Sequence, residues 1–207
     1  MKKLITLLIF IGIINIANAQ FFVGADLKGG FGNVNCNEDN TSEGFSTGGN
    51  LRIGYEFLNH FSLSTGFSTY RINYKETLAI QYVSDPPPIA EYSTFKDHIN
   101  YYSIPLKLGY FFQPNRVRLF ANIGLMSAKS VKNTSIYYKS GWNLAYSGEI
   151  GVGYQIKEKF LLTLSGEYIK HCRTRLTDRS LSNAYYYNYY YNKPYFYGLN
   201  LGVRYYF

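Results

Sequence analysis

Histidine and cysteine are scarce in this sequence, whose 207 residues include three histidines and two cysteines. His60, His98 and His171 are scattered along the chain and lack the spacing of a known metal site. No phosphate-binding loop or nucleotide fingerprint is present, so neither a metal nor a cofactor is expected. Because no recognisable catalytic set is assembled from these residues, we expect a protein that is not an enzyme.

Long apolar runs are absent except at the start of the chain, where Leu4 to Ile16 is almost unbroken. A short basic segment precedes this run, and Ala17-Asn18-Ala19 follows it as a small-x-small cleavage site. This pattern predicts a secretory signal peptide over residues 1–19 and one mature domain over residues 20–207. A membrane anchor is the alternative, but the run is short for a bilayer span. No later segment approaches 18 apolar residues, so no membrane helix is expected in the mature chain.

Charged residues make up only 16% of the chain, and the formal net charge is +8. A basic balance can indicate nucleic-acid binding. In this chain the cations form no cluster and the predicted signal peptide sends the protein out of the cytoplasm. We therefore expect no nucleic-acid partner.

Aromatic residues are abundant, with 23 tyrosines and 15 phenylalanines, and there are 19 glycines. This composition is typical of a membrane β-barrel, in which aromatic side chains lie at the lipid interfaces and glycine fits a crowded interior. Half of the residues in each strand of such a barrel are polar, so hydropathy alone does not reveal the strands.

Alternating hydrophobicity is clearest in the last twelve residues, where apolar side chains occupy every second position from Tyr197 to Phe207. Alternation of this kind places apolar residues on one face of a strand and small or polar residues on the other. Eight segments share the pattern, and each is about ten residues or longer, which is enough to cross a membrane at a tilt. The segments are Phe21–Phe31, Phe45–Leu58, Phe61–Tyr70, Ile99–Phe112, Val117–Ala128, Leu144–Ile156, Phe160–Lys170 and Phe196–Phe207. The predicted fold is an all-β, eight-stranded antiparallel up-and-down transmembrane β-barrel.

The connections between these segments alternate in length. The short ones are Asn59-His60, Gln113–Arg116 and Lys157–Lys159, and the long ones are Gly32–Gly44, Arg71–His98, Lys129–Asn143 and His171–Tyr195. Outer-membrane barrels have short periplasmic turns and long external loops, so both termini are expected in the periplasm. Aromatic residues gather near both sets of connections on the predicted lipid face. A soluble sandwich, which is the alternative fold, has no reason to sort aromatic residues in this way.

Two segments carry a family resemblance: Tyr-Ser-Ile-Pro-Leu-Lys-Leu-Gly-Tyr at Tyr102–Tyr110, and Gly-x-Gly-Tyr at Gly151–Tyr154. With eight strands, they resemble the small OmpX/OmpA-like and PorT-like outer-membrane β-barrel proteins of Bacteroidota. The resemblance implies an integral outer-membrane protein surrounded by lipid and lipopolysaccharide. It also implies that the last strand, which ends on Phe207, is the assembly signal recognised by the barrel assembly machinery. Some members of the family belong to secretion or gliding machinery.

The inward face of the predicted barrel carries charges of both signs. These residues are Asp26, Lys28, Arg52, Glu56, Lys107, Arg118, Glu149, Glu167 and Arg204. An eight-stranded barrel is just wide enough for its own side chains, and buried charges need partners. We expect a mutually paired plug, and a selective pore or proton path is the alternative.

The long connections are expected to hold any specific function. Candidate contact residues in the last of them are Arg173, Arg175, Arg179, Tyr186 and Tyr190, because arginine and tyrosine suit an acidic glycan, lipid phosphates or a surface protein. The same tyrosine-rich run is also consistent with a stiff hairpin that extends strands seven and eight. Cys36 and Cys172 are both expected at the external end, where an oxidising location permits a disulfide.

The favoured function is therefore a structural or surface-interaction role without catalysis. One alternative is a subunit of an envelope secretion or gliding complex. Another is a lipid-modifying enzyme that uses a histidine and a serine near the outer interface, with His171 and Ser180, or His98 and Ser103, as candidates. We expect these four to be solvated loop residues instead.

Overall fold

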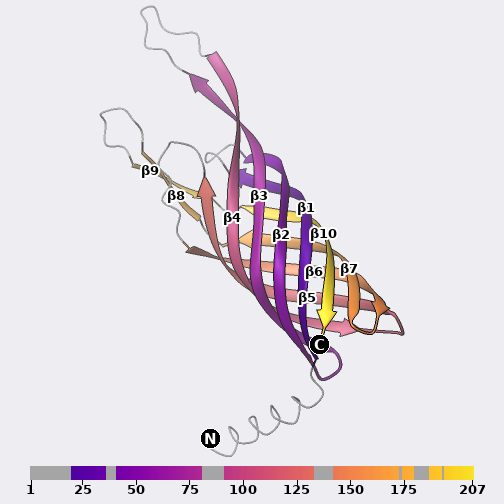
Figure 1. The fold of residues 1–207 in the computed structure, drawn as a ribbon. Coiled ribbons are helices and arrows are strands. Elements are labelled where there is room, and N and C mark those ends of the chain that lie inside the picture. The colour runs from indigo at the N-terminus through magenta and orange to yellow at the C-terminus, as the bar shows by residue number, and fades with distance from the viewer. Residues whose placement is uncertain are drawn as a thin grey trace, which may run out of the picture.

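The computed structural model describes residues 20–35, 41–80, 91–132, 142–172, 174–179, 187–192 and 194–207. These residues form ten strands (Figure 1): β1 (Gln20–Asn35), β2 (Thr41–Phe57), β3 (Phe61–Ile80), β4 (Glu91–Phe112), β5 (Val117–Lys132), β6 (Trp142–Lys157), β7 (Phe160–His171), β8 (Thr174–Arg179), β9 (Tyr187–Asn192) and β10 (Tyr195–Tyr206). Eight of them close into an antiparallel barrel in the order β1-β10-β7-β6-β5-β4-β3-β2. The predicted fold and all eight predicted strands are confirmed. None of the described residues belongs to a helix that is long and apolar enough to cross a membrane.

Alternation along each strand separates a lipid-facing surface from a filled interior. Leu27 and Ile150 are 73% and 71% exposed, whereas their strand neighbours Asp26 and Glu149 are 7% and 5% exposed. Aromatic side chains form a belt near each end of the outer surface, as the sequence predicts. Phe31 and Phe45 pack with ring centroids 6.0 Å apart in the belt near the long connections, which we call the outer belt. Phe61 and Tyr110, at 5.5 Å, belong to the inner belt beside the short turns.

The strands are longer at the ends that meet the long connections than the sequence analysis predicted. β3 was expected to end near Tyr70 and β4 to begin at Ile99, but the two strands stay paired from Ile72↔Ile99 as far as Ile80↔Glu91. This hairpin projects beyond the rest of the barrel (Figure 1). The alternation with apolar residues facing outward ends at this level, because the apolar residues of both strands change face.

The change of face is plain within β3. Phe67 points outward and is 46% exposed, but the apolar side chains that follow, Tyr70, Ile72 and Tyr74, are buried in the interior. The residues between them are polar and exposed. In lipid the outward face must be apolar, and in water it must be polar, so this inversion marks the level at which the barrel wall leaves the membrane.

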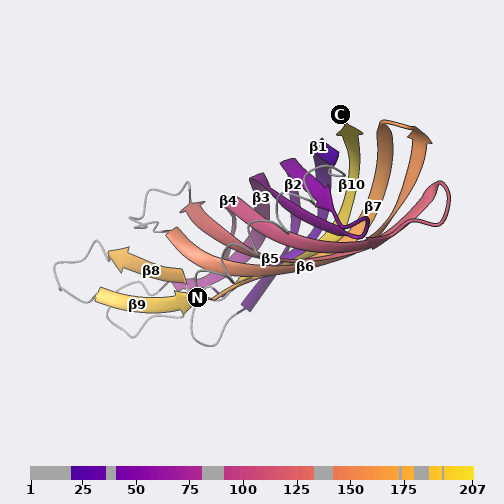
Figure 2. The same cartoon turned by 90° about the horizontal axis from the view of Figure 1, so that it is seen from below.

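The remaining two strands, β8 and β9, form a separate two-stranded sheet. It lies at the end of the barrel opposite the C-terminus (Figures 1 and 2). The hairpin predicted from the tyrosine-rich run is therefore present. It is not a continuous extension of the barrel strands, because β7 ends at His171 and β10 begins at Tyr195.

The short turns gather at the end where the chain of the barrel begins and ends. Leu58, Asn59 and Asn115 have positive φ angles of 52°, 60° and 58°. Asparagine tolerates this left-handed conformation well, which suits it to tight turns. The amide of Phe207 donates to the carbonyl of Phe21 at 3.1 Å, so both ends of the barrel chain meet there.

Candidate functional site

The nine charged residues predicted for the lumen all lie inside the barrel, and none is more than 7% exposed. They come from β1, β2, β4, β5, β6, β7 and β10, because each of these strands turns every second side chain inward. They are divided between a central group and a group at the short-turn end.

The central group is a neutral network of three cations and three carboxylates. Lys107 Nζ lies 2.8 Å from Glu149 Oε2 and 2.6 Å from Glu167 Oε1, and so bridges the two glutamates. Lys28 Nζ is 2.5 Å from the other oxygen of Glu167. Arg52 joins Glu149 at 3.3 Å to Asp26 at 3.0 Å. Because each charge has an opposite partner, the cost of burying it is offset by a close ion pair.

Neutral side chains complete this network. Asn122 and Ser165 donate to Glu149 at 3.0 and 2.9 Å, and Asn200 donates to Glu167 at 3.1 Å. A cavity of about 10 Å³ beside Ser68 and Lys107 offers about the space of one water molecule. The centre of the barrel is therefore filled by side chains.

At the short-turn end, Arg118 and Arg204 are held in different ways. Arg118 donates to Glu56 at 2.5 Å and to the hydroxyl of Tyr206 at 2.6 Å, and Tyr206 in turn donates to Glu56 at 2.8 Å. The guanidinium of Arg204 instead lies over the rings of Phe22 and Phe120, 5.2 and 4.8 Å from their centroids. The sequence predicted that Arg204 points inward but gave no sign of this aromatic sandwich, which attracts a cation to the ring faces.

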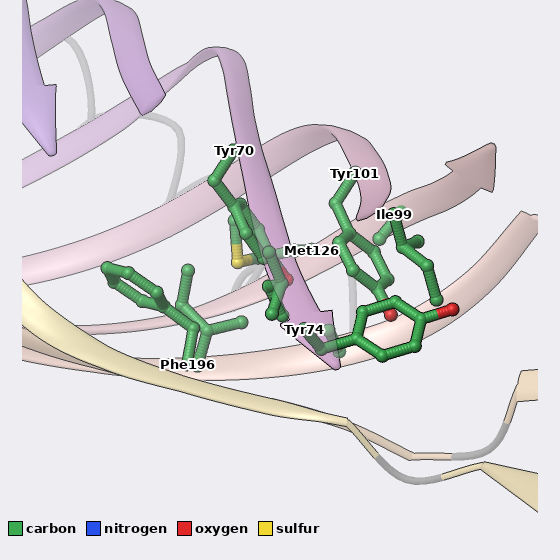
Figure 3. Packing of buried hydrophobic residues seen from close by; sticks show 10 residues of the cluster. Tyr70, Tyr74, Ile99, Tyr101, Met126 and Phe196 are labelled. Carbon is green, nitrogen blue, oxygen red and sulfur yellow. The ribbon is translucent and has the colours of Figure 1, made fainter. Parts of the chain in front are cut away.

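The outer part of the lumen holds an apolar plug that the sequence analysis missed (Figure 3). Tyr70 and Tyr101 stack with centroids 4.9 Å apart, and Phe196 packs on Tyr70 at 5.3 Å. Met126 is 1% exposed beside them. The sequence does carry a signal for this plug. Beyond the outer belt the inward positions are apolar, although a polar interior was expected there. Together with the central network, this plug packs the described part of the lumen from the middle toward its outer end.

His171 belongs to the same plug, so its prediction as a solvated loop residue is wrong. It is the last residue of β7, points inward and is 2% exposed. Its Nε2 is in hydrogen-bond contact with the hydroxyl of Tyr70, and its ring lies 4.8 Å from that of Tyr101. β7 extends one residue further than predicted, which brings His171 into the packed interior.

The histidine–serine pairs do not form a hydrolase site in the described residues. Ser103 is 1% exposed in the lumen, whereas His98, five residues earlier on β4, is on the opposite face of the strand. Ser180 lies outside the described residues. Gly44–Gly48 has the Gly-x-Ser-x-Gly spacing of a nucleophile elbow, but it runs extended inside β2 and Ser46 is fully buried. An elbow needs a strand-to-helix turn.

Metal ligands are likewise not assembled in the described part of the chain, where no three histidine, cysteine or acidic side chains are grouped to hold an ion. The described interior residues form ion pairs, hydrogen bonds and aromatic contacts.

The chain matches the model of the outer membrane protein beta-barrel domain over residues 4–207. It belongs to this family. As a member, it is an integral outer-membrane protein. Neisserial surface protein A is similar in structure, with a TM-score of 0.57 at 16% identity, covering 91% of this chain and 99% of that chain. OprG from Pseudomonas aeruginosa gives 0.52 at 15% identity, covering 89% and 95%. No curated protein matches the chain in sequence.

These identities show a shared fold and nothing finer. The resemblance to Bacteroidota and PorT-like proteins therefore stays a prediction, as does the signal peptide, whose residues lie outside the described ranges.

The candidate contact residues of this family member are only partly described. Arg175 and Arg179 are on β8, and Tyr190 is on β9, where it pairs with Leu176. Arg173 and Tyr186 lie outside the described residues.

Of the two cysteines, one is described by the structure. Cys172 is exposed directly after β7, at the end with the long connections. Cys36 lies outside the described residues, so the bridge stays a prediction.

Phe207 is 70% exposed, and its ring packs edge-on against Tyr205 at 5.2 Å. A side chain this exposed contributes little to the fold. Its role as an assembly signal stays a prediction.

Proposed function

We propose that this outer-membrane barrel is non-catalytic and acts at the cell surface through its external connections, with both termini in the periplasm. The observation that carries the proposal is the filled interior. The central ion pairs, the arginine groups at the short-turn end and the aromatic plug fill the lumen along its length. Because packed side chains occupy the described part of the lumen, a role through the outer surfaces is favoured over a role as a pore.

The end with the long connections is the surface best suited to a partner. The β3–β4 hairpin and the β8–β9 sheet both lie at this end of the barrel (Figure 1). The last connection combines Arg173, Arg175 and Arg179 with several tyrosines. Arginine can bind an acidic group through two parallel hydrogen bonds, and tyrosine adds amphipathic contact area. The partner is a surface protein or glycan with acidic groups.

A role in an envelope secretion complex, of the PorT-like kind, would use the same surface. It differs in the partner, which would then be a component of that machinery. The lipid-modifying alternative has less support, because His98 and Ser103 are on opposite faces and His171 is engaged with Tyr70.

The test is affinity capture from solubilised envelope membranes. One variant replaces Arg173, Arg175 and Arg179 with Ser, and a second replaces Tyr186 and Tyr190 with Ser. The matched control replaces the exposed Arg116, Lys157 and Lys159 at the short-turn end with Ser. We expect both loop variants to lose the same partner and the control to retain it.

The identity of the captured protein separates a secretion machine from another surface partner. If the loop variants fold and capture the same proteins and lipids as the wild type, the surface-interaction proposal is wrong.

A further inference from the structure

The lipid-facing wall of the barrel carries an open groove of about 830 Å³ across β1, β10, β7 and β6. This volume is within the range of about 300–1,000 Å³ that ligand pockets span. Phe31, Tyr168, Tyr197, Leu199 and Ile150 line it, and all five are exposed side chains of the outer face.

Three glycines create the hollow. Gly29, Gly148 and Gly166 are at outward positions of their strands, and a Cβ added to any of them would meet nothing within 4 Å. The neighbouring outward positions Leu27, Leu199 and Ile150 carry aliphatic side chains. The glycines are therefore not required by close packing, and each leaves open space on the wall.

An aromatic row overhangs the hollow on the outer side. Strand pairing places Phe45, Phe31, Tyr197 and Tyr168 side by side on four adjacent strands. The next outward row toward the middle of the membrane contains Gly29, Leu199, Gly166 and Ile150. The groove thus opens toward the hydrocarbon of the membrane and is capped at the outer interface.

Positive charge lies directly beyond this cap. Lys170 is half-buried, two residues after Tyr168 on the same face of β7, and it pairs with Tyr195 and Tyr146. It is one of several outward cations above the outer belt, together with Arg71, Lys75, Lys96 and Lys129. Because the change of face in β3 places this level at the membrane surface, these cations meet the head groups, and phosphate is the anion found there.

We propose that the groove binds one lipid A molecule of the outer leaflet, with an acyl chain beneath the aromatic row and a phosphate at Lys170. A flexible chain of methylenes fills an apolar, elongated hollow that is open to lipid. Lys170 is placed next to the groove on β7, and its ammonium suits a phosphate of the head group. Arg71, Lys75, Lys96 and Lys129 are on β3, β4 and β5, away from the groove. A second copy of the barrel would present a convex wall, which is not self-complementary to a groove. The inference uses the proposed orientation, with the long connections outside.

The experiment measures retention of diphosphoryl lipid A by the purified barrel in detergent, using native mass spectrometry. The groove is filled in two variants, Gly29→Leu and Gly166→Leu, and its cation is removed in Lys170→Gln. Controls are Ala121→Leu, an exposed outward position on β5, and Lys129→Gln, a cation beyond the belt that does not adjoin the groove. Heat-dependent gel mobility verifies that each variant is folded.

We expect one lipid A per barrel in the wild type and both controls. Each groove variant and Lys170→Gln should raise the dissociation constant by about tenfold or more, equivalent to about 1.4 kcal/mol. Equal retention in groove variants and controls overturns the proposal. The proposal is also overturned if the wild type binds phosphatidylglycerol as tightly as lipid A. It is likewise overturned if the wild type forms a dimer that Gly29→Leu and Gly166→Leu disrupt. This measurement uses purified barrel and lipid A and does not depend on a partner captured by the loops. A failure here and a failure of the loop capture are therefore independent results.

Discussion

Glu149 connects more of the interior than a single ion pair would. Its carboxylate lies between Lys107 and Arg52 and also accepts hydrogen bonds from Asn122 and Ser165. Removing its charge would leave two buried cations without sufficient compensation. Buried charges are costly unless they are paired, so the free energy of unfolding should depend strongly on this residue.

Replacing Glu149 with Gln should therefore lower the free energy of unfolding by about 3–5 kcal/mol, the usual cost of breaking a buried pair. Glu158→Gln is the matched control, because Glu158 is exposed in the turn between β6 and β7 and should change stability by no more than about 0.5 kcal/mol. Urea unfolding in lipid vesicles, followed by gel mobility, measures both. Equal stability of the two variants would contradict a paired lumen.

At the residue scale, the sequence predicts which side chains enter the lumen but not how they pair. Alternation alone identifies all nine charged residues. The partners depend on barrel closure and register, which bring Lys28 next to Glu167, 139 positions away. Arg204 between two rings and His171 against Tyr70 were not predicted, because a periodic pattern says nothing about distances across the interior.

At the scale of the element, each long strand has two parts with opposite patterns. In the membrane, apolar residues face lipid and polar residues face the lumen. Beyond the outer belt, as in Tyr70, Ile72 and Tyr74 of β3, apolar residues face the lumen. A single alternating pattern therefore predicts the membrane part of β3 and β4 and misses their extensions.

The last strand, β10, closes the barrel, and Phe207, which follows it, is predicted to act as an assembly signal. The strand pairs with β1 from Tyr206 to Tyr195 and closes the barrel, but the exposed Phe207 adds only one backbone hydrogen bond and an aromatic contact. Deleting Phe207 should reduce the amount of protein in the outer membrane severalfold, while the stability of refolded protein changes by less than about 1 kcal/mol.

Phe112→Ser is the control for the Phe207 deletion. Phe112 is 52% exposed in the same inner belt, but it does not end the chain, so its loss should leave insertion near the wild-type level. Quantitative immunoblotting of outer-membrane fractions measures both variants. Wild-type levels of the Phe207 deletion would show that this residue is not the assembly signal.

For the whole molecule, closure between β1 and β10 turns two distant ends of the chain into neighbours and removes every exposed sheet edge from the barrel. The sequence predicts this closure because its eight alternating segments are typical of an up-and-down barrel. It does not predict the β8–β9 sheet as a separate unit, because the tyrosine-rich run is equally consistent with a continuation of the barrel strands. The groove beneath the outer belt was also missed, since it depends on which glycines become neighbours around the wall.

Packed side chains occupy the interior of the barrel, and we propose that the protein acts through its surfaces. Single-channel recording in planar bilayers tests it most directly, with purified, folded protein and an open porin inserted in parallel as a positive control. We expect no stable conductance steps above the bilayer background, because packed side chains fill the lumen from its short-turn end to its outer plug. Reproducible steps from the wild-type protein, abolished by its denaturation, would contradict it.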